Sequence, residues 1–437
     1  MELTSPLQSI KLPRIAWDLL EMRSAGNPLL PCLHTLHLLD VDPEDPVGVM
    51  LLLSPSIRHL VLGATRREHA ANPAFIMMIT SSLPNLLTLR IHGYIYVPPR
   101  SLIHLPHLSQ LHSLNIAFGG IVADYDALQV ITRLRSLKCL TLAVALEPHQ
   151  LTRPLALGTG FLGLEHLHLH GDIQEIRAIL LACEQYPRMQ SFGLVIVSAL
   201  SVETILDTFA IARDKLTDTA ANLQLRILPD FDFSLYSFVD IFEPFFSLHK
   251  VNSFLVDFGK YFPRMNDHDM SRLATAWPTL TTLTFLCEET QGARPDGLLT
   301  IHGLAELARR CPLLEYLALP ILDVENLPSP SNVPRLKHEA LSELEVFELR
   351  GEETVDVASL AVVLDRLFPN LERPTSLKTE DFTQHNGMFS RPPGALDYAK
   401  LLMGAIAANR ECEKATGEIG AECAHPTRPD EQDGPAS

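Results

Sequence analysis

Three histidines alternate with leucines in the segment LEHLHLH, which begins at residue 164 and is the feature best suited to chemistry. If this segment is a strand, His166, His168 and His170 project from one face, because side chains two residues apart share a face. Two such imidazoles can bind one metal ion, and Glu165 and Asp172 are the nearest carboxylates. The outer two imidazoles diverge by about 13 Å, so we interpret all three as recognition residues and expect no metal site. A metal-dependent enzyme centred on this strand is the alternative.

A glycine pattern just before these histidines matches a cofactor-binding motif. Gly158, Gly160 and Gly163 fit the G-x-G-x-x-G spacing of dinucleotide-binding loops. Such a loop must open a helix, whereas the residues after Gly163 alternate as in a strand. The motifs G-x-S-x-G and H-E-x-x-H and the phosphate loop are absent, and no nucleophile lies at a recognisable spacing from a base. We therefore expect no cofactor, no catalytic residue and no enzymatic activity.

The charge of the chain limits its partners. Among 437 residues, Lys and Arg number 35 and Asp and Glu number 52, which gives a net charge of −17. Nucleic acids and anionic lipids both require a cationic surface, so we expect neither nucleic acid nor membrane as a partner. The sequence also contains no run of about eighteen apolar residues and no apolar leader at its start, so it predicts neither a transmembrane helix nor a signal peptide.

The seven cysteines indicate a compartment. Their number is odd, their spacings are wide and no C-x-x-C pattern occurs. This usage is typical of a reducing environment, so we expect a cytoplasmic or nuclear protein. Cys32, Cys139 and Cys183 stand among apolar neighbours and are predicted to be small core residues.

An apolar pattern with the spacing Φ-x-x-Φ-x-Φ recurs along most of the chain. Thirteen copies, the last of them partial, follow one another at intervals of about 28 residues, a length within the range of leucine-rich repeats. No unit can bury its apolar stripes alone, so the units must stack into a solenoid. The copies are Leu33-Leu36-Leu38, Ile57-Leu60-Leu62, Leu86-Leu89-Ile91, Leu111-Leu114-Ile116, Leu137-Leu140-Leu142, Leu164-Leu167-Leu169, Met189-Phe192-Leu194, Ala220-Leu223-Leu225, Val251-Phe254-Val256, Leu280-Leu283-Phe285, Leu314-Leu317-Leu319, Leu344-Phe347-Leu349 and a partial one at Leu371.

Proline provides a second, independent signal of the repeat. It lies two residues before the first apolar position in seven of the thirteen copies. Proline ends helices and favours extended backbone before it, so each unit reads as helix, stop and short strand. Apolar stripes predict helices within 172–186, 304–311 and 357–367, the first opening with a cap-like pair, Asp172 and Glu175. The prolines are Pro31, Pro55, Pro84, Pro187, Pro278, Pro312 and Pro369.

Four segments carry a family resemblance: PLLPCLHTLHL at 28–38, LPNLLTLRI at 83–91, CPLLEYLAL at 311–319 and FPNLE at 368–372. They resemble leucine-rich-repeat proteins, and especially the repeat half of the F-box/leucine-rich-repeat proteins of mushroom-forming fungi. The resemblance implies an α/β leucine-rich-repeat solenoid, or horseshoe, with a parallel inner sheet and outer helices. It also implies a non-catalytic function, as the substrate-binding repeat region of an F-box-type ubiquitin-ligase receptor.

Two features depart from that family. The Asn or Cys usually found three residues after the last apolar position is absent from every copy, so another group must satisfy the loop backbone. An F-box of about forty to fifty residues does not fit within 1–30, and we interpret LPRIAWDLL at 12–20 as an N-terminal capping helix. The ligase's adaptor subunit is thus a partner only if an F-box lies upstream. A stand-alone scaffold or inhibitor is the alternative.

Strand alternation turns the residues between the apolar positions toward the concave face. Thirteen strands at about 4.8 Å each give an arc on the order of 60 Å, which suits a protein or peptide held by a monomeric solenoid. The central column of this face is predicted to run from His37 to Glu348. The candidate binding residues are His37, His59, Arg90, His92, His166, His168, His170, Arg226, Asp257, Tyr316 and Arg350.

The sequence divides into four predicted segments. Residues 1–30 form an N-terminal flank or cap, 31–373 the solenoid, 374–409 an irregular segment with a helix, and 410–437 a disordered tail. Within the solenoid, residues 231–262 hold nine of the nineteen phenylalanines, which we interpret as packing of an enlarged repeat, with an exposed aromatic loop as the alternative. Acidic residues gather over 339–356; we interpret them as solvated surface, with a basic partner as the alternative.

Overall fold

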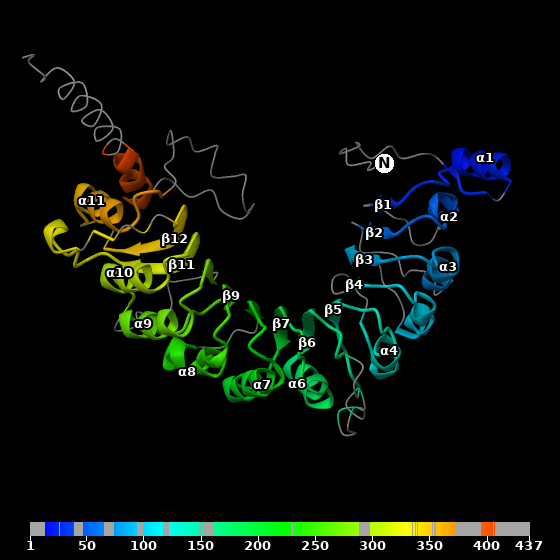
Figure 1. Ribbon diagram of the computed structural model, residues 1–437, viewed down its shortest axis with the longest axis horizontal. Coiled ribbons are helices and arrows are strands. Elements are labelled where there is room, and N and C mark those ends of the chain that lie inside the picture. The colour runs from blue at the N-terminus through cyan, green and yellow to red at the C-terminus, as the bar shows by residue number, and fades with distance from the viewer. Residues whose placement is uncertain are drawn as a thin grey trace, which may run out of the picture.

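The computed structural model shows a curved stack of repeats, in which strands line the inside of an arc and helices lie outside (Figure 1). This arrangement confirms the predicted fold class, an α/β leucine-rich-repeat solenoid. The structure describes residues 14–371 and 395–406 except for 26, 39–46, 65–73, 94–98, 117–121, 148–150, 152–154, 156, 158–160, 229–230, 232, 288–297, 334, 337, 339, 352, 354 and 405.

Within the described residues, a single sheet of twelve parallel strands follows the order of the chain. Each strand pairs only with the strands before and after it, so every repeat contacts its immediate neighbours. The strands are β1 (Thr35–Leu38), β2 (His59–Ala64), β3 (Thr88–Gly93), β4 (Ser113–Ile116), β5 (Cys139–Ala143), β6 (His166–Asp172), β7 (Ser191–Ser198), β8 (Asn222–Ile227), β9 (Ser253–Asp257), β10 (Thr282–Leu286), β11 (Tyr316–Asp323) and β12 (Glu343–Arg350).

Helices return the chain along the convex side, and the three predicted from apolar stripes are confirmed as α6, α10 and α11. None of the described helices is both long and apolar enough to cross a membrane. The helices are α1 (Arg14–Ser24), α2 (Val47–Leu52), α3 (Ala74–Ser82), η1 (Pro99–His107), α4 (Tyr125–Ile131), α6 (Ile173–Ala182), α7 (Val202–Lys215), η2 (Phe233–Leu235), α8 (Phe238–Phe242), η3 (Glu243–Ser247), α9 (Asp267–Ala276), α10 (Ile301–Arg310), η4 (Pro330–Asn332) and α11 (Val357–Leu367).

The repeated prolines stand in the turns that lead from helix to strand. Leu86 donates its backbone N–H to the carbonyl oxygen of Leu83 at 3.1 Å, which closes a four-residue turn with Pro84 in second position. The same bond closes the turns at Pro278 and Pro312. Proline's fixed φ matches that position, so its recurrence marks the phase of the repeat.

The apolar triplets form one continuous core. Leu60, Leu89 and Leu114 lie opposite one another on β2, β3 and β4, and each is at most 1% exposed. Residues at equivalent positions along the sheet belong to the same hydrophobic cluster from Leu33 to Leu371. Stacking thus buries, at each interface between repeats, the apolar side chains that a single repeat would leave exposed.

The register of β12 corrects the twelfth triplet. Leu344 pairs with Leu317 and therefore holds the second position of the pattern, with Leu341 first and Val346 third. All three are buried, whereas Phe347, predicted to be a core residue, is 46% exposed. Two overlapping patterns with the same spacing exist here, and pairing with β11 selects between them. The prediction that Glu348 ends the central column was wrong; Glu345, opposite Ala318, does so.

At two repeat boundaries, carboxylates at the start of a helix bind the backbone that an Asn or Cys side chain usually binds in leucine-rich repeats. Asp172 and Glu175 form the predicted capping box at α6, in which Asp172 accepts from Gln174 N at 2.8 Å. Glu175 also accepts from Leu146 N in the preceding repeat at 2.8 Å. Similarly, Asp267 accepts from both Thr300 N and Thr300 Oγ1, each at 2.7 Å. These carboxylates satisfy backbone donors across a repeat boundary.

The phenylalanines of 231–262 fill the core of the enlarged repeat, as predicted. Phe238, Phe242 and Phe254 are fully buried, and their rings lie 4.7 to 6.3 Å apart. Trp277 packs on Phe254 with a centroid distance of 4.8 Å. Two of these contacts are tilted and two are edge-on, and edge-on packing is one of the arrangements that aromatic rings prefer. The described phenylalanines of this segment therefore serve mainly to pack the core.

Of the three cysteines predicted to be core residues, only one is fully buried. Cys183 is buried, Cys139 is half-buried on the sheet, and Cys32 is exposed. The prediction for Cys32 was wrong because this residue follows Pro31 in the turn, where side chains point outward. The described cysteines are all free thiols.

A helix over residues 395–404 lies at the C-terminal end of the sheet. Its residues Leu396, Ala399 and Met403 join the core, and Lys400 Nζ donates to the carbonyl oxygen of Leu344 on β12. This helix therefore extends the core past β12 and contacts that last strand through Lys400. The segment boundaries at 30, 373 and 409 stay predictions, and 410–437 lie outside the described residues.

Candidate functional site

The candidate site is the concave face, which parallel pairing organises into rows across the strands (Figure 1). His166 on β6 stands between Cys139 on β5 and Ser191 on β7, and His168 stands in the next row, opposite Gly193. Because register is continuous from strand to strand, residues far apart in sequence become neighbours in each row. The structure therefore brings the predicted site residues onto one surface but spreads them along its length.

The three histidines of β6 are not equivalent. His166 and His168 are half-exposed, whereas His170, predicted to share the open face, is only 9% exposed. His168 leans across β7, so that its Nε2 lies 3.3 Å from Ser191 Oγ and its ring covers Gly193. A Cβ atom on Gly193 would collide with that ring. Because Gly193 has no side chain, the ring of His168 has room to lie over β7.

The surroundings of these imidazoles keep two of them uncharged at neutral pH. Burial, followed by the charge of His166, lowers the pKa of His168. Burial lowers the pKa of His170 from 6.5 to about 4, and the charges of His168 and Arg226 act in the same direction. A neutral imidazole both donates and accepts hydrogen bonds, so these side chains suit polar recognition.

The N-terminal strands carry the next group of predicted residues. Arg90 on β3 is exposed, as are His37 on β1 and His59 on β2, whose Nδ1 lies 3.1 Å from Thr88 Oγ1. His92 lies against Gly63 of the adjacent strand, where a Cβ atom would be 2.8 Å from its Nε2. The sequence predicted these positions but not the direction in which each ring leans.

The two arginines predicted on the C-terminal strands both lie in ion pairs. Arg226 Nε lies 3.0 Å from Asp257 Oδ2, two residues that the sequence predicted separately and the register places side by side. Tyr316 Oη donates to Glu345 Oε2 at 2.9 Å. Burial and the carboxylate of Glu345 raise the pKa of Tyr316 above its ordinary range.

Sequence reasoning missed two carboxylates that bind side chains of these strands. Arg350 lies at the end of β12, where its Nε is 3.4 Å from Glu325 Oε1. Neither Glu325 nor Glu345 was a predicted site residue. A correct register for the twelfth triplet would have identified Glu345, whereas Glu325 lies in a connecting segment with no sequence signal.

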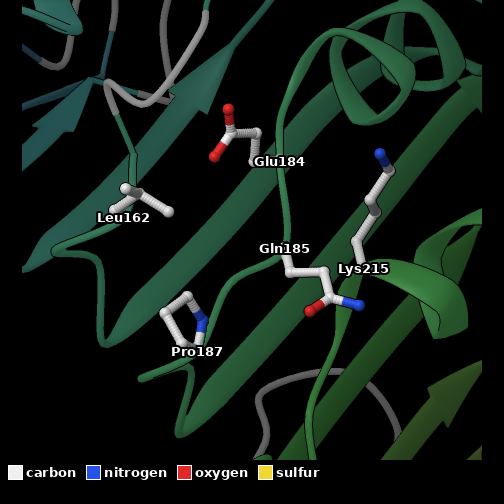
Figure 2. A pocket seen from close by; sticks show the side chains of 5 residues that line it. All are labelled: Leu162, Glu184, Gln185, Pro187 and Lys215. Atoms are coloured by element: carbon white, nitrogen blue, oxygen red, sulfur yellow. The ribbon is translucent and has the colours of Figure 1, made fainter.

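The described residues offer no metal centre, because no group of three or more His, Cys, Asp or Glu side chains converges in them. The glycine motif does not open a helix: Gly163 lies just before β6, and Gly158 and Gly160 lie outside the described residues. A shallow open depression lies where helices lead into strands, lined by Leu162, Glu184, Gln185, Pro187 and Lys215 (Figure 2). Lys215 Nζ donates to Cys183 O at 2.7 Å, which uses one of its three N–H donors.

The parallel sheet and the repeated units define the chain as a leucine-rich-repeat solenoid. No protein-family model and no curated protein sequence matches it. A chain from the crystal structure of the Rad7–Elc1 complex of yeast is similar, with a TM-score of 0.45 and 14% identity over 78% of this chain and 82% of that one. The internalin InlF of Listeria monocytogenes is similar with a TM-score of 0.39 and 13% identity, over 83% and 89% of the two chains.

Proposed function

We propose that this protein is a non-catalytic recognition module that holds a protein target on its concave face. The observation that carries the proposal is the face itself: a sheet of twelve strands whose described outward residues are mostly polar and include exposed imidazole and guanidinium groups. Extended concave surfaces of this kind suit macromolecules, whereas small ligands require enclosing walls.

The finer role is that of the substrate-binding repeat region of an F-box-type ubiquitin-ligase receptor. The repeat style, with proline at the helix-to-strand turn, supports this role through the resemblance of segments such as LPNLLTLRI and CPLLEYLAL. A protein with this role works in the cytoplasm or nucleus as a monomer. The adaptor subunit of the ligase joins it only through an F-box upstream of the repeats.

Affinity capture with charge-reversed variants tests the recognition function. Arg90→Glu alters the concave face, and Arg133→Glu, at an exposed residue just after α4, is the matched control. We expect a target captured by the wild-type chain to be lost with Arg90→Glu and retained with Arg133→Glu. A target insensitive to Arg90→Glu and to further reversals on the sheet would contradict the proposal. Co-capture of a ligase adaptor tests the finer role, and its consistent absence from cell extracts would count against that role.

A further inference from the structure

The two ends of the concave face carry opposite charges that are not compensated within the described chain. On β1–β6, the described outward side chains in the rows of the sheet include one full cation, Arg90, and several imidazoles. The one carboxylate on these strands, Asp172 at the end of β6, accepts hydrogen bonds from Gln174 N and Ser198 Oγ at the start of α6 and the end of β7. On β12, Glu343 and Glu345 occupy the first and central rows. A uniform binding surface would not separate charge in this way.

Arg90 is well placed to bind an anion. It stands in the central row of β3, between Val61 and Asn115 on the neighbouring strands, and it is exposed. Among the described residues no carboxylate lies within ion-pair distance of it. His59 on the adjacent strand β2 and His92 on β3 itself add imidazole hydrogen-bonding groups nearby. This end therefore presents a guanidinium that the fold leaves available.

On the strands from β8 to β12, the arginine side chains are already held in ion pairs within the chain. Arg226 pairs with Asp257 and Arg350 pairs with Glu325. Glu345 accepts a hydrogen bond from Tyr316, and neither Glu345 nor exposed Glu343 forms an ion pair with any residue that the structure describes. The end at β11 and β12 thus keeps a net negative charge toward the concavity.

We propose that the concave face binds an extended polypeptide segment of a partner protein with an acidic end over β3–β6 and a basic end over β11–β12. This inference rests on the proposed function and specifies the partner's chemistry and orientation. Nine strand intervals of about 4.8 Å separate β3 from β12, or roughly 43 Å along the sheet, which an extended segment of about 13 residues spans. Charge complementarity then sets the orientation of the segment more than its affinity.

Synthetic peptides test the proposal directly on the full chain. The probe has glutamates at one end, lysines at the other, a Gly-Ser spacer, a total length of about 13 residues, and a photo-crosslinking residue beside the glutamates. We expect it to bind about tenfold more tightly than a neutral peptide with glutamine at every charged position, with the difference shrinking as salt rises. Cross-links should map to β2–β6.

Variants of the chain make the test specific. Arg90→Glu should weaken binding of the charged peptide about tenfold, and Arg133→Glu should leave it unchanged. Combining Arg90→Glu with Glu343→Lys and Glu345→Lys reverses the polarity of the face, so the same peptide should cross-link to β11 and β12 instead. A folded circular-dichroism spectrum for each variant excludes loss of structure as the cause.

The outcomes separate this inference from the proposed function. Equal binding of the charged and neutral peptides, no binding of either, or cross-links at the wrong end would overturn the polarity proposal. If the polarity proposal fails but concave-face variants lose captured protein targets, the proposed recognition function stands. If captured targets ignore every concave-face variant, the recognition function fails as well.

Discussion

The strands β1–β6 and β7–β12 share one backbone plan but carry different side chains. The first 170 residues contain 12 Lys and Arg, 12 Asp and Glu, and 12 of the 18 histidines. The remaining residues contain 23 Lys and Arg and 40 Asp and Glu, so they hold the whole net charge of −17. The described core up to Leu157 is aliphatic, whereas the core around β9 is aromatic. Histidine lines one half of the face, whereas the other half carries ion-paired arginines together with Glu343 and Glu345, which form no ion pair with a described residue.

This comparison shows that the repeat separates structural from functional positions. Inward positions must stay apolar, yet they accept leucine or phenylalanine as long as the interface is filled. Outward positions contribute little to the stack, so they are free to vary in charge. A difference between halves at inward positions should therefore affect stability, and a difference at outward positions should affect binding.

The largest expected effect lies in the aromatic core. Phe254→Ala removes a fully buried ring that contacts Phe238, Phe242, Phe285 and Trp277. We expect a loss of about 3–5 kcal/mol in the free energy of unfolding, because the cavity cannot be refilled by rigid neighbours. Urea denaturation measures it. Phe347→Ala, at a residue 46% exposed, is the control and should change stability by less than about 0.5 kcal/mol. Equal effects at the two positions would contradict the register of β12.

An intermediate effect is expected from the histidine-lined half. His170 has a pKa of about 4 in the folded chain against 6.5 ordinarily, so below pH 6.5 the unfolded chain binds a proton that the folded chain excludes. The contribution of His170 to stability is therefore constant above about pH 6.5 and falls as the pH drops toward 4. His170→Gln should remove a pH-dependent loss on the order of 2 kcal/mol. The measurement is urea denaturation at several pH values.

The control for this prediction is His59→Gln, because His59 is exposed on β2. The free energy of unfolding of the His59→Gln variant should change with pH in the same way as that of the wild type. If His170→Gln and wild type lose stability in parallel between pH 6.5 and 4, the burial of His170 does not control its protonation.

The smallest effect is expected at the charged pairs. Arg226–Asp257 and Lys138–Glu165 each join at 3.0 Å, one in each half, with the cation about half exposed. Solvent screening limits such pairs, so double-mutant cycles with glutamine and asparagine substitutions should give coupling energies between about 0 and 1 kcal/mol in both halves. A coupling above about 2 kcal/mol at Arg226–Asp257 would show that this pair stabilises the fold and is not free for recognition.

Most of the fold could be predicted from the sequence. The apolar triplets and the prolines recur locally, and each proline position corresponds to a turn that only a few neighbouring residues define. The cap at Asp172 and Glu175 was predictable for the same reason. The twelfth triplet was not, because Leu341 and Leu344 each begin a sequence pattern of the right spacing and only pairing with β11 distinguishes them.

The candidate site was predictable as a list of outward positions but not as an arrangement. Alternation along a strand identified His168 and Arg226, yet their partners, Ser191 and Asp257, stand in the next repeat more than twenty residues away. His170 was expected to be as open as His166, and its burial depends on neighbours from other strands. Arg90 likewise forms no ion pair with a described residue because its neighbours on β2 and β4, Val61 and Asn115, are not carboxylates.

What the sequence by itself determined is the repeating unit: its length, its helix-to-strand turn and its two apolar stripes, all set by the conformational preferences of nearby residues. What the tertiary structure decided is which side chains meet across the sheet. Lateral contacts between strands depend on register and curvature, and these are properties of the whole stack because each strand is held in place by the two beside it.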